Sequence, residues 1–243
     1  MQNWFLAPWP ELIASPVVWI TVTLVVYLAA FRIYDHFNNH PLLLPVLTAG
    51  IVVVGILMAT GTPYAEYEQA TRFLYFLIGP ATVALAVPLY TQLPRLRQMW
   101  KPISVALLVG CFTAILSALG IAWVFGATTD TLLSLAPKSA TMPIAMEVAD
   151  LTGGIASLTT VACAITGISG AILTGGLLRF MKITDPVVHG FAMGLSAHAI
   201  GTGRAFQVDE TTGAFSALGL SLNGVATAVI VPFVLAALGL FTF

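Results

Sequence analysis

Long runs of apolar residues dominate this sequence and decide what the chain can fold into. Residues 16–31, 41–60 and 103–125 form three such runs, each near the length of about 20 residues that a helix needs to cross the hydrocarbon core of a membrane. Only 8% of the 243 residues are charged, against about 25% in ordinary soluble domains. Strict alternation of polar and apolar residues is absent, so the runs predict helices and not a β-barrel. We therefore expect an all-α integral membrane protein with about six full crossings.

Lysine and arginine residues gather at three places, each next to an apolar run. Because cytoplasmic loops carry an excess of these residues, we expect all three places on the cytoplasmic side and the amino terminus outside. The segment 61–70, which has glutamates and no lysine or arginine, then falls outside. The three places are Arg32, the group Arg95, Arg97 and Lys101, and the pair Arg179 and Lys182.

Two segments interrupt the apolar pattern of the second half of the chain. The first, at about 127–153, contains Pro137 and Pro143, which remove backbone donors and break helices. The second, at about 184–212, contains the polar stretch SAHAIGTGRA and precedes a final helix expected from about Phe215. Non-helical backbone survives at membrane depth only where protein or water surrounds it. We therefore expect two opposed re-entrant hairpins whose tips meet near the middle of the membrane, as in many transporters.

We expect residues 1–243 to form a single membrane domain. In this interpretation, about 1–70 are scaffold-like helices and about 71–243 form the core that carries the hairpins. A third interruption at 78–88 shares with 139–146 an Ala-Thr pair followed by small and apolar residues, a pattern that favours an inverted repeat. Elsewhere in the core, Gly167, Ala171 and Gly175 recur every four residues and predict a smooth helix face for close packing.

Three blocks of the core, PKSATMPIAMEVADLTGGIASLT, DPVVHGFAMGLSAHAIGTGRA and GPATVALAVPLY, resemble the signature blocks of the LrgB/CidB family. Its members include bacterial antiholin-like proteins and the plastidal glycolate/glycerate translocator, and the resemblance begins at about Leu77. It implies a bacterial inner membrane protein that transports small monocarboxylates, of the pyruvate, glycolate or glycerate class. The alternative that it implies is control of murein hydrolase activity and cell lysis with a holin-like LrgA/CidA-type partner. Gly203 departs from the family, where alanine or serine is expected.

A small 2-hydroxy or 2-oxo acid presents a carboxylate and a neighbouring oxygen atom. A site for it needs a cation, hydroxyl groups and backbone amides at broken helix ends, whose partial positive charge attracts anions. An imidazole with an unperturbed pKa of about 6.5 also suits proton coupling. The candidate substrate-binding residues are Lys138, Ser139, Thr141, Ser196, His198, Gly201, Thr202, Gly203 and Arg204, and the candidates for proton coupling are His198 and Glu147.

Four of these residues also have a structural interpretation. Lys138 could extend to the outer interface, and Arg204 could be an ordinary cytoplasmic charge. His198 could donate to a backbone carbonyl, and Glu147 could lie at the interface. Because Lys138 has no acidic residue close in sequence, whereas Asp209 follows Arg204 closely, we expect Lys138 to be the main cation for the substrate.

Other classes of function find no support in the sequence. It has no nucleotide-binding glycine loop, zinc-ligand spacing or nucleophile elbow, so we expect no enzymatic activity, cofactor or metal. The net charge of −1 gives no basis for nucleic-acid binding. Cys111 and Cys163 lie in apolar runs and are expected to pack as small apolar side chains. Besides substrate and lipid, the candidate partners are an LrgA/CidA-like subunit and further copies of the chain.

Overall fold

The computed structural model describes residues 15–37, 40, 43–84 and 86–241, and all regular elements in these ranges are helices. The helices form two compact units, Met1–Ala84 and Leu85–Phe243. Four helices in the described part of the chain are long and apolar enough to cross a membrane, namely α2 (Pro16–His36), α9 (Trp100–Val124), α12 (Ala156–Phe180) and α14 (Glu210–Ala237). The bent pair α3 (Pro45–Thr60) and α4 (Tyr64–Ala70) would add a fifth crossing. The protein is therefore a polytopic helical membrane protein, and its described residues hold four or five candidate crossings where about six were expected for the chain.

The first unit begins with two proline-initiated helices, α2 (Pro16–His36) and α3 (Pro45–Thr60). Gly61, at φ +68°, ends α3, and the chain then bends by 119° into α4 (Tyr64–Ala70). Most of the segment 61–70 is therefore helical, because a new helix starts after Pro63. Trp19 on α2 packs edge-on against Tyr67, with ring centroids 5.5 Å apart.

Short helices follow between α4 and α9. They are α5 (Arg72–Phe76), α6 (Ile78–Ala84), α7 (Ala86–Thr91) and α8 (Leu93–Gln98). Residue 85, which separates α6 from α7, lies outside the described residues. The interruption expected at 78–88 and the inverted repeat therefore stay predictions. The tryptophans near the amino terminus predict a short interfacial helix before Pro16, but residues 1–14 lie outside the described residues.

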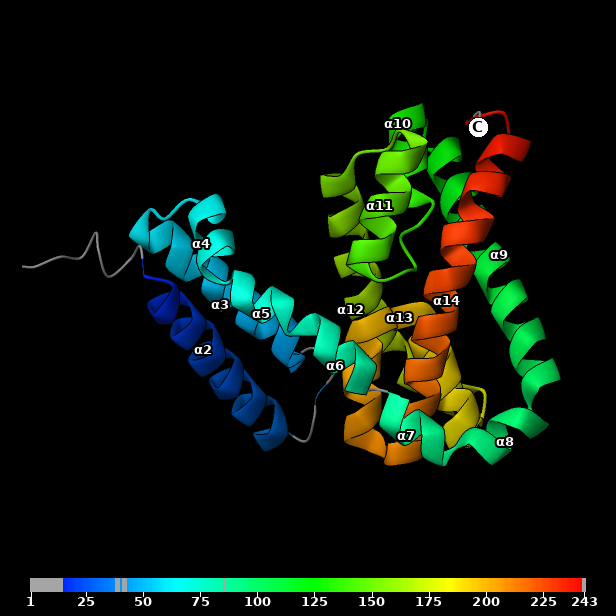
Figure 1. The fold of residues 1–243 in the computed structure, drawn as a ribbon, viewed down its shortest axis with the longest axis horizontal. Coiled ribbons are helices and arrows are strands. Elements are labelled where there is room, and N and C mark those ends of the chain that lie inside the picture. The colour runs from blue at the N-terminus through cyan, green and yellow to red at the C-terminus, as the bar shows by residue number, and fades with distance from the viewer. Residues whose placement is uncertain (1–14, 38–39, 41–42, 85, 242–243) are drawn as a thin grey trace, which may run out of the picture. The chain divides into compact units, whose positions relative to one another are not determined.

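The second unit holds three of the four long helices and both broken segments (Figure 1). In the view of Figure 1, α7, α8 and the start of α14 lie at its lower end, and α10 lies at its upper end with the end of α14. Asp185 caps α13 (Pro186–Val208) by accepting a hydrogen bond from the Val187 N–H at 2.7 Å. The helices after α8 are α9 (Trp100–Val124), α10 (Thr129–Leu135), α11 (Met142–Thr152), α12 (Ala156–Phe180), α13 (Pro186–Val208) and α14 (Glu210–Ala237).

Basic residues from two parts of the chain meet at the lower end of this unit. Arg95 of α8 lies 3.8 Å from the carboxylate of Asp185, at the start of α13. Arg179 lies near the end of α12, only a few residues before Asp185. The group that contains Arg95 and the pair that contains Arg179 therefore lie at the same end of the second unit. This agrees with their expected location on the same side of the membrane.

Helix α13 consists of two segments that meet at His198. The backbone of His198 has φ 39° and ψ −133°, which no helix contains. Beyond it the chain turns back, because a Cβ atom at Gly201 would lie 2.8 Å from the carbonyl oxygen of Met193. In a straight helix these two residues would be about 12 Å apart along the axis. Residues 186–197 and 199–208 are thus the two arms of a helical hairpin.

The two arms run in opposite directions along α14. A Cβ atom at Gly190 would overlap the backbone of Thr212, and one at Gly194 would overlap the backbone of Ser216, so the first arm runs parallel to α14. In the second arm, Thr202 instead bonds to Ser216. Nearer the end of this second arm, Phe206 lies against Gly213, which precedes Ser216 in α14. The second arm is therefore antiparallel to α14, and α14 begins at Glu210 and not near Phe215, because Asp209 caps it through the Thr212 N–H at 2.9 Å.

The segment between α9 and α12 forms the other broken element. Helix α10 is followed by a non-helical stretch at 136–141, and α11 then leads back to α12 through a short loop. Ser134, at the end of α10, accepts a hydrogen bond from the Ile155 N–H at 2.7 Å. Its carbonyl oxygen accepts another from the Thr159 hydroxyl at 2.9 Å. These bonds tie α10 to the start of α12 and leave residues 136–141 as the tip of the element.

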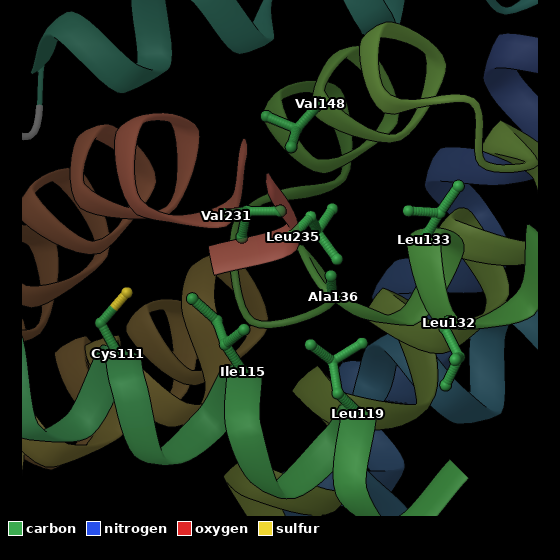
Figure 2. Close-up of a cluster of buried hydrophobic side chains, with 9 residues drawn as sticks. All are labelled: Cys111, Ile115, Leu119, Leu132, Leu133, Ala136, Val148, Val231 and Leu235. Atoms are coloured by element: carbon green, nitrogen blue, oxygen red, sulfur yellow. The ribbon is translucent and has the colours of Figure 1, made fainter. Parts of the chain in front are cut away.

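Two apolar clusters hold the broken elements against α9 and α14. Figure 2 shows the upper cluster, in which Cys111, Ile115 and Leu119 of α9 project toward α10, α11 and α14. The lower cluster joins Ile103 of α9 to the first arm of α13 and the start of α14. Both cysteines are buried and free, as expected of small packing residues. The remaining members of the upper cluster are Leu132, Leu133, Ala136, Val148, Val231 and Leu235.

The glycine contact between the first arm and α14 leaves no room for a side chain. We expect Gly194→Ala to destabilise the protein by about 1–3 kcal/mol, because the new methyl group meets backbone atoms that cannot rotate away. Gly203→Ala is the matched control, since nothing lies within 4 Å of its Cβ position, and it should be neutral or stabilising by up to about 1 kcal/mol. Thermal unfolding midpoints in detergent test this, and equal midpoints for the two variants would contradict it.

Candidate functional site

The tip of the first broken element holds three of the predicted site residues, Lys138, Ser139 and Thr141. Ser139 is buried, whereas Lys138 and Thr141 are partly exposed. Thr141 precedes the first turn of α11, and no side chain caps that turn. The uncapped helix end carries a partial positive charge. Among the described residues, the Lys138 ammonium group forms no ion pair, so the tip presents positive charge that no carboxylate of the described chain neutralises.

His198 forms the tip of the second broken element. Its positive φ angle is uncommon for a residue other than glycine and marks a strained reversal of the chain. Its Nε2 atom lies 2.9 Å from the carbonyl oxygen of Cys163 on α12. Because a carbonyl oxygen only accepts, Nε2 carries a hydrogen and donates it. This is the hydrogen bond to a backbone carbonyl that the structural interpretation of His198 expected. The other ring nitrogen, Nδ1, takes no part in it.

The small residues of α12 make room for this tip. A Cβ atom at Gly167 would lie 2.7 Å from Nε2 of His198, so only glycine allows the imidazole at this place. At Gly170 a Cβ atom would lie 2.9 Å from the carbonyl oxygen of Ser196. Ala171 is also buried. The smooth face predicted from Gly167, Ala171 and Gly175 therefore packs against α13.

Asn223, in the middle of α14, joins the two tips. Its Nδ2 atom donates to the carbonyl oxygen of Ser139 at 2.7 Å and to that of Leu195 at 3.4 Å. The side chain is 1% exposed, and its Oδ1 atom has no hydrogen-bond partner among the described residues. Our sequence reasoning missed this residue. The sequence did contain a signal that could have identified it: Asn223 is a single amide in a long apolar helix, where an unpaired polar group is costly.

Lys138 lies near enough to His198 and Cys163 for its charge to act on both, and the carbonyl oxygen of Cys163 accepts the hydrogen bond of His198. With the bonds of Asn223, these contacts bring Lys138, Ser139 and His198 into one neighbourhood. Residues from α12, α14 and both tips therefore form a single polar centre inside an otherwise apolar unit.

Three other predicted residues near the second tip stabilise the hairpin. Thr202 donates to the carbonyl oxygen of His198 at 2.9 Å, so Ser216 must be the donor in their 2.9 Å contact. Ser196 donates to the carbonyl oxygen of Ala192 at 2.7 Å. Gly201 allows the second arm to fold against Met193.

Arg204, Gly203 and Glu147 lie away from the tips. Arg204 is six residues beyond His198, about 9 Å along a helix, and its charge acts on His189 at the lower end. Gly203, just before Arg204, has open space at its Cβ position. Glu147 is exposed on α11, six residues beyond Thr141. The structure therefore divides the predicted set into a group at the tips and a group toward the two ends of the unit.

Charged groups surround the lower end of the second hairpin. His189 interacts with Asp209, Arg204 and Arg179. Burial raises the pKa of the Asp209 carboxyl, but hydrogen bonds from the hydroxyl and backbone N–H of Thr212 outweigh burial and lower this pKa below its usual value. Asp209 therefore stays ionised beside the basic residues of this end.

A cavity of about 340 Å³ lies near the upper ends of α9 and α14. Because its lining is apolar, it offers a carboxylate no partner and does not belong to the polar centre. Among the described residues, no group of three His, Cys, Asp or Glu side chains could hold a metal ion. The residues that line the cavity are Leu116, Leu119, Gly120, Trp123, Leu132, Leu238 and Leu240.

Comparison of the amino-acid sequence with those of known proteins identifies several relatives. The chain is 36% identical over 218 residues to the uncharacterized protein YxaC of Bacillus subtilis, which covers 90% of this chain and 94% of the relative. It is 31% identical to the holin-like protein CidB of Staphylococcus epidermidis, over 89% of this chain and 94% of CidB. It is 27% identical to the antiholin-like protein LrgB of Bacillus cereus, over 90% of this chain and 95% of LrgB. No solved structure matches the chain significantly.

The family match includes the polar centre and both broken elements. Residues 23–237 match the LrgB-like family, so the match begins well before Leu77, where our own resemblance began. It includes most of α2 and extends to the end of α14. The chain belongs to the LrgB-like family.

Proposed function

We propose that this protein carries small monocarboxylates across a bacterial inner membrane by alternating access. The observation that carries the proposal is the pair of bonds from Asn223 to Ser139 and Leu195, which brings two broken helical elements to one point. Opposed discontinuous helices whose broken ends meet are the usual construction of a transporter site. In this proposal, α10 and α11 enter from the outer face and the two arms of α13 from the cytoplasm, with the amino terminus outside and one membrane domain.

The chemistry of the tips fits a carboxylate. Lys138 supplies a partly exposed ammonium group, and the uncapped start of α11 supplies partial positive charge beside it. Thr141 adds a hydroxyl group that caps no helix. Charges at membrane depth are costly, by about 2.5–3.5 kcal/mol even on the lenient insertion scale, and therefore favour a functional role. In this proposal Lys138 binds the carboxylate, and Arg204 assists or gates at the cytoplasmic end.

Proton coupling is the second part of the proposal. His198 donates through Nε2 to Cys163, which leaves Nδ1 to take up a proton. Lys138 interacts electrostatically with the ring, so a bound carboxylate that neutralises Lys138 would favour the charged imidazole. Substrate and proton would then bind together. Glu147 remains the second candidate for coupling.

A second candidate function is regulation of holin-like pores and murein hydrolase activity together with an LrgA/CidA-type subunit. The names of two relatives, holin-like CidB and antiholin-like LrgB, support this function more directly than they support transport. It requires a contact surface for the partner and makes no use of a polar centre. The contacts at the two tips favour transport, and the relatives' names favour regulation, so an experiment must separate the two.

Uptake into proteoliposomes separates transport from regulation. With the purified chain alone, we expect saturable uptake of at least one of labelled pyruvate, glycolate and glycerate, and faster uptake under an inward proton gradient. Protein-free liposomes and Lys101→Met, a change to an exposed lysine in α9, serve as controls. Absence of uptake for all three acids, together with altered lysis in cells that lack the protein, would favour the regulator.

The role of Lys138 can be tested against that of Arg204. We expect Lys138→Met to weaken binding of the preferred acid about ten- to a hundredfold, because a charge-assisted contact contributes roughly 1.5–3 kcal/mol. Arg204→Met should have a smaller effect, since Arg204 lies about 9 Å along the helix from the tip and acts on His189. Binding to both folded variants is measured by calorimetry. Near-wild-type affinity in Lys138→Met would overturn the assignment.

The role of His198 can be tested by removing its titration alone. In His198→Gln, we expect the proton gradient to lose its effect on uptake while exchange between the two faces continues, because glutamine keeps a polar group but cannot carry a proton. Both rates are measured in the same proteoliposomes. Loss of exchange as well would instead assign His198 a structural role, through its bond to Cys163.

A further inference from the structure

The apolar cavity near the upper ends of α9 and α14 is a pocket with a buried floor and an exposed rim. Leu119 of α9 and Leu132 of α10 form the floor, and each is 5% exposed. Leu116, Trp123 and Leu238 form the rim, and all three are exposed. Both floor residues belong to the upper apolar cluster (Figure 2). The pocket therefore leads from the surface of the second unit to its interior.

An exposed face of α9 leads to the rim of this pocket. Val109, Phe112 and Leu116 are exposed and follow one another at intervals of three and four residues, so they lie on one face of the helix. Gly120 and Trp123, which line the pocket, continue the same spacing. Because α9 is a candidate membrane crossing, an apolar face of this kind contacts the acyl chains of lipids. The pocket is thus continuous with the lipid-contacting surface of the protein.

The pocket lies at the depth of the first part of an acyl chain. Trp123 is next to the last residue of α9 and is 72% exposed, and tryptophan side chains prefer the interface between head groups and hydrocarbon. Leu116 precedes it by two turns, which is about 10 Å along the helix axis. A phospholipid whose head group lies beside Trp123 would therefore place its chain along the rim and over the floor.

The shape and lining of the pocket suit an alkyl chain better than water or a folded protein segment. Leucine side chains supply most of the lining in the described chain and offer water no hydrogen bond, and apolar cavities stay dry. A helix of another protein is about 10–12 Å wide, so it would rest on the exposed rim without reaching Leu119 and Leu132. An alkyl chain is narrow and flexible enough to reach both.

We propose that this pocket binds one acyl chain of a membrane phospholipid. The site recognises the chain and not the head group, because none of the residues that line it in the described chain is charged. A chain that fills the pocket restores the dispersion contacts that an empty space lacks. Since Leu132 belongs to α10, the bound chain also becomes part of the packing that holds the first broken element against α9. The inference is independent of whether the protein transports or regulates.

Photochemical labelling of the full chain tests the inference. The protein is reconstituted into vesicles of phosphatidylethanolamine and phosphatidylglycerol that contain a phospholipid with a diazirine at the end of one acyl chain. After illumination, we expect labels on Leu119 and Leu132 as well as on the lipid-facing Phe112, because a chain end inside the pocket contacts its floor. A phospholipid with the diazirine on its head group should label neither floor residue. Labels on Phe112 with none on the floor from the chain-end probe would overturn the inference.

A variant that fills the pocket tests it a second time. Gly120 lines the pocket, and among the described residues nothing lies within 4 Å of its Cβ position. In Gly120→Leu, labelling of the floor should fall about tenfold, because protein interiors are close-packed and the new side chain takes the space of the lipid chain. Labelling of Phe112 should not change. Gly176→Leu in α12 is the matched control, since its Cβ position is equally open and it does not line the pocket. Equal labelling of the floor in the two variants would contradict the inference.

Labelling in native membranes distinguishes a lipid from a protein partner. If a second subunit covered the pocket, the floor would be labelled in vesicles of the purified chain and protected in native membranes, and that result would overturn the inference. Labelling of the floor in both settings supports it. If Gly120→Leu fails to fold, the two probes on the wild-type protein still decide. Floor labels from the chain-end probe alone support the inference, and floor labels from both probes or from neither contradict it.

Discussion

Breaking a helix inside a membrane protein frees backbone groups that no lipid can satisfy, and the second unit depends on how these groups are paired. Asn223 binds the carbonyl oxygens of Ser139 and Leu195, one from each broken element. Thr202 binds the carbonyl oxygen of His198 at the reversal itself. Most polar side chains near the tips are therefore engaged with backbone. Without these bonds, each tip would leave buried acceptors unpaired at a cost of about 1–3 kcal/mol per group.

This pairing limits which polar groups remain for a ligand. Thr202 has given its hydrogen to a carbonyl and receives one from Ser216, so its hydroxyl has little capacity left. His198 has committed Nε2 but not Nδ1. Lys138, Thr141 and Oδ1 of Asn223 keep their capacity, as far as the described residues show. The polar centre therefore keeps a cation, a hydroxyl, an imidazole nitrogen and an acceptor oxygen that the described backbone does not engage.

The sequence predicts this arrangement well where a pattern is local and poorly where a contact is distant. Apolar runs and prolines predicted the long helices and the interruption at 136–141, and spacing by four predicted the packing face that contains Gly167. Asn223 could not be predicted, because its partners lie 84 and 28 residues away in the chain. The end of the second hairpin was also misjudged. Asp209 starts α14 through a side-chain cap, which composition alone does not distinguish from an ordinary loop charge.

The packing sets which parts of the second unit can move relative to one another. The first arm of α13 meets α14 backbone to backbone at Gly190 and Gly194, where any sliding would bring main-chain atoms into collision. These two helices must therefore move together. The first broken element instead rests on α9 and α14 through flexible apolar side chains such as Leu132 and Leu235. Its tip is held to α14 by one strong polar contact, from Asn223 to Ser139. Asn223 is thus the residue that links the pair of α13 and α14 to the first broken element, which the bonds of Ser134 also tie to the start of α12.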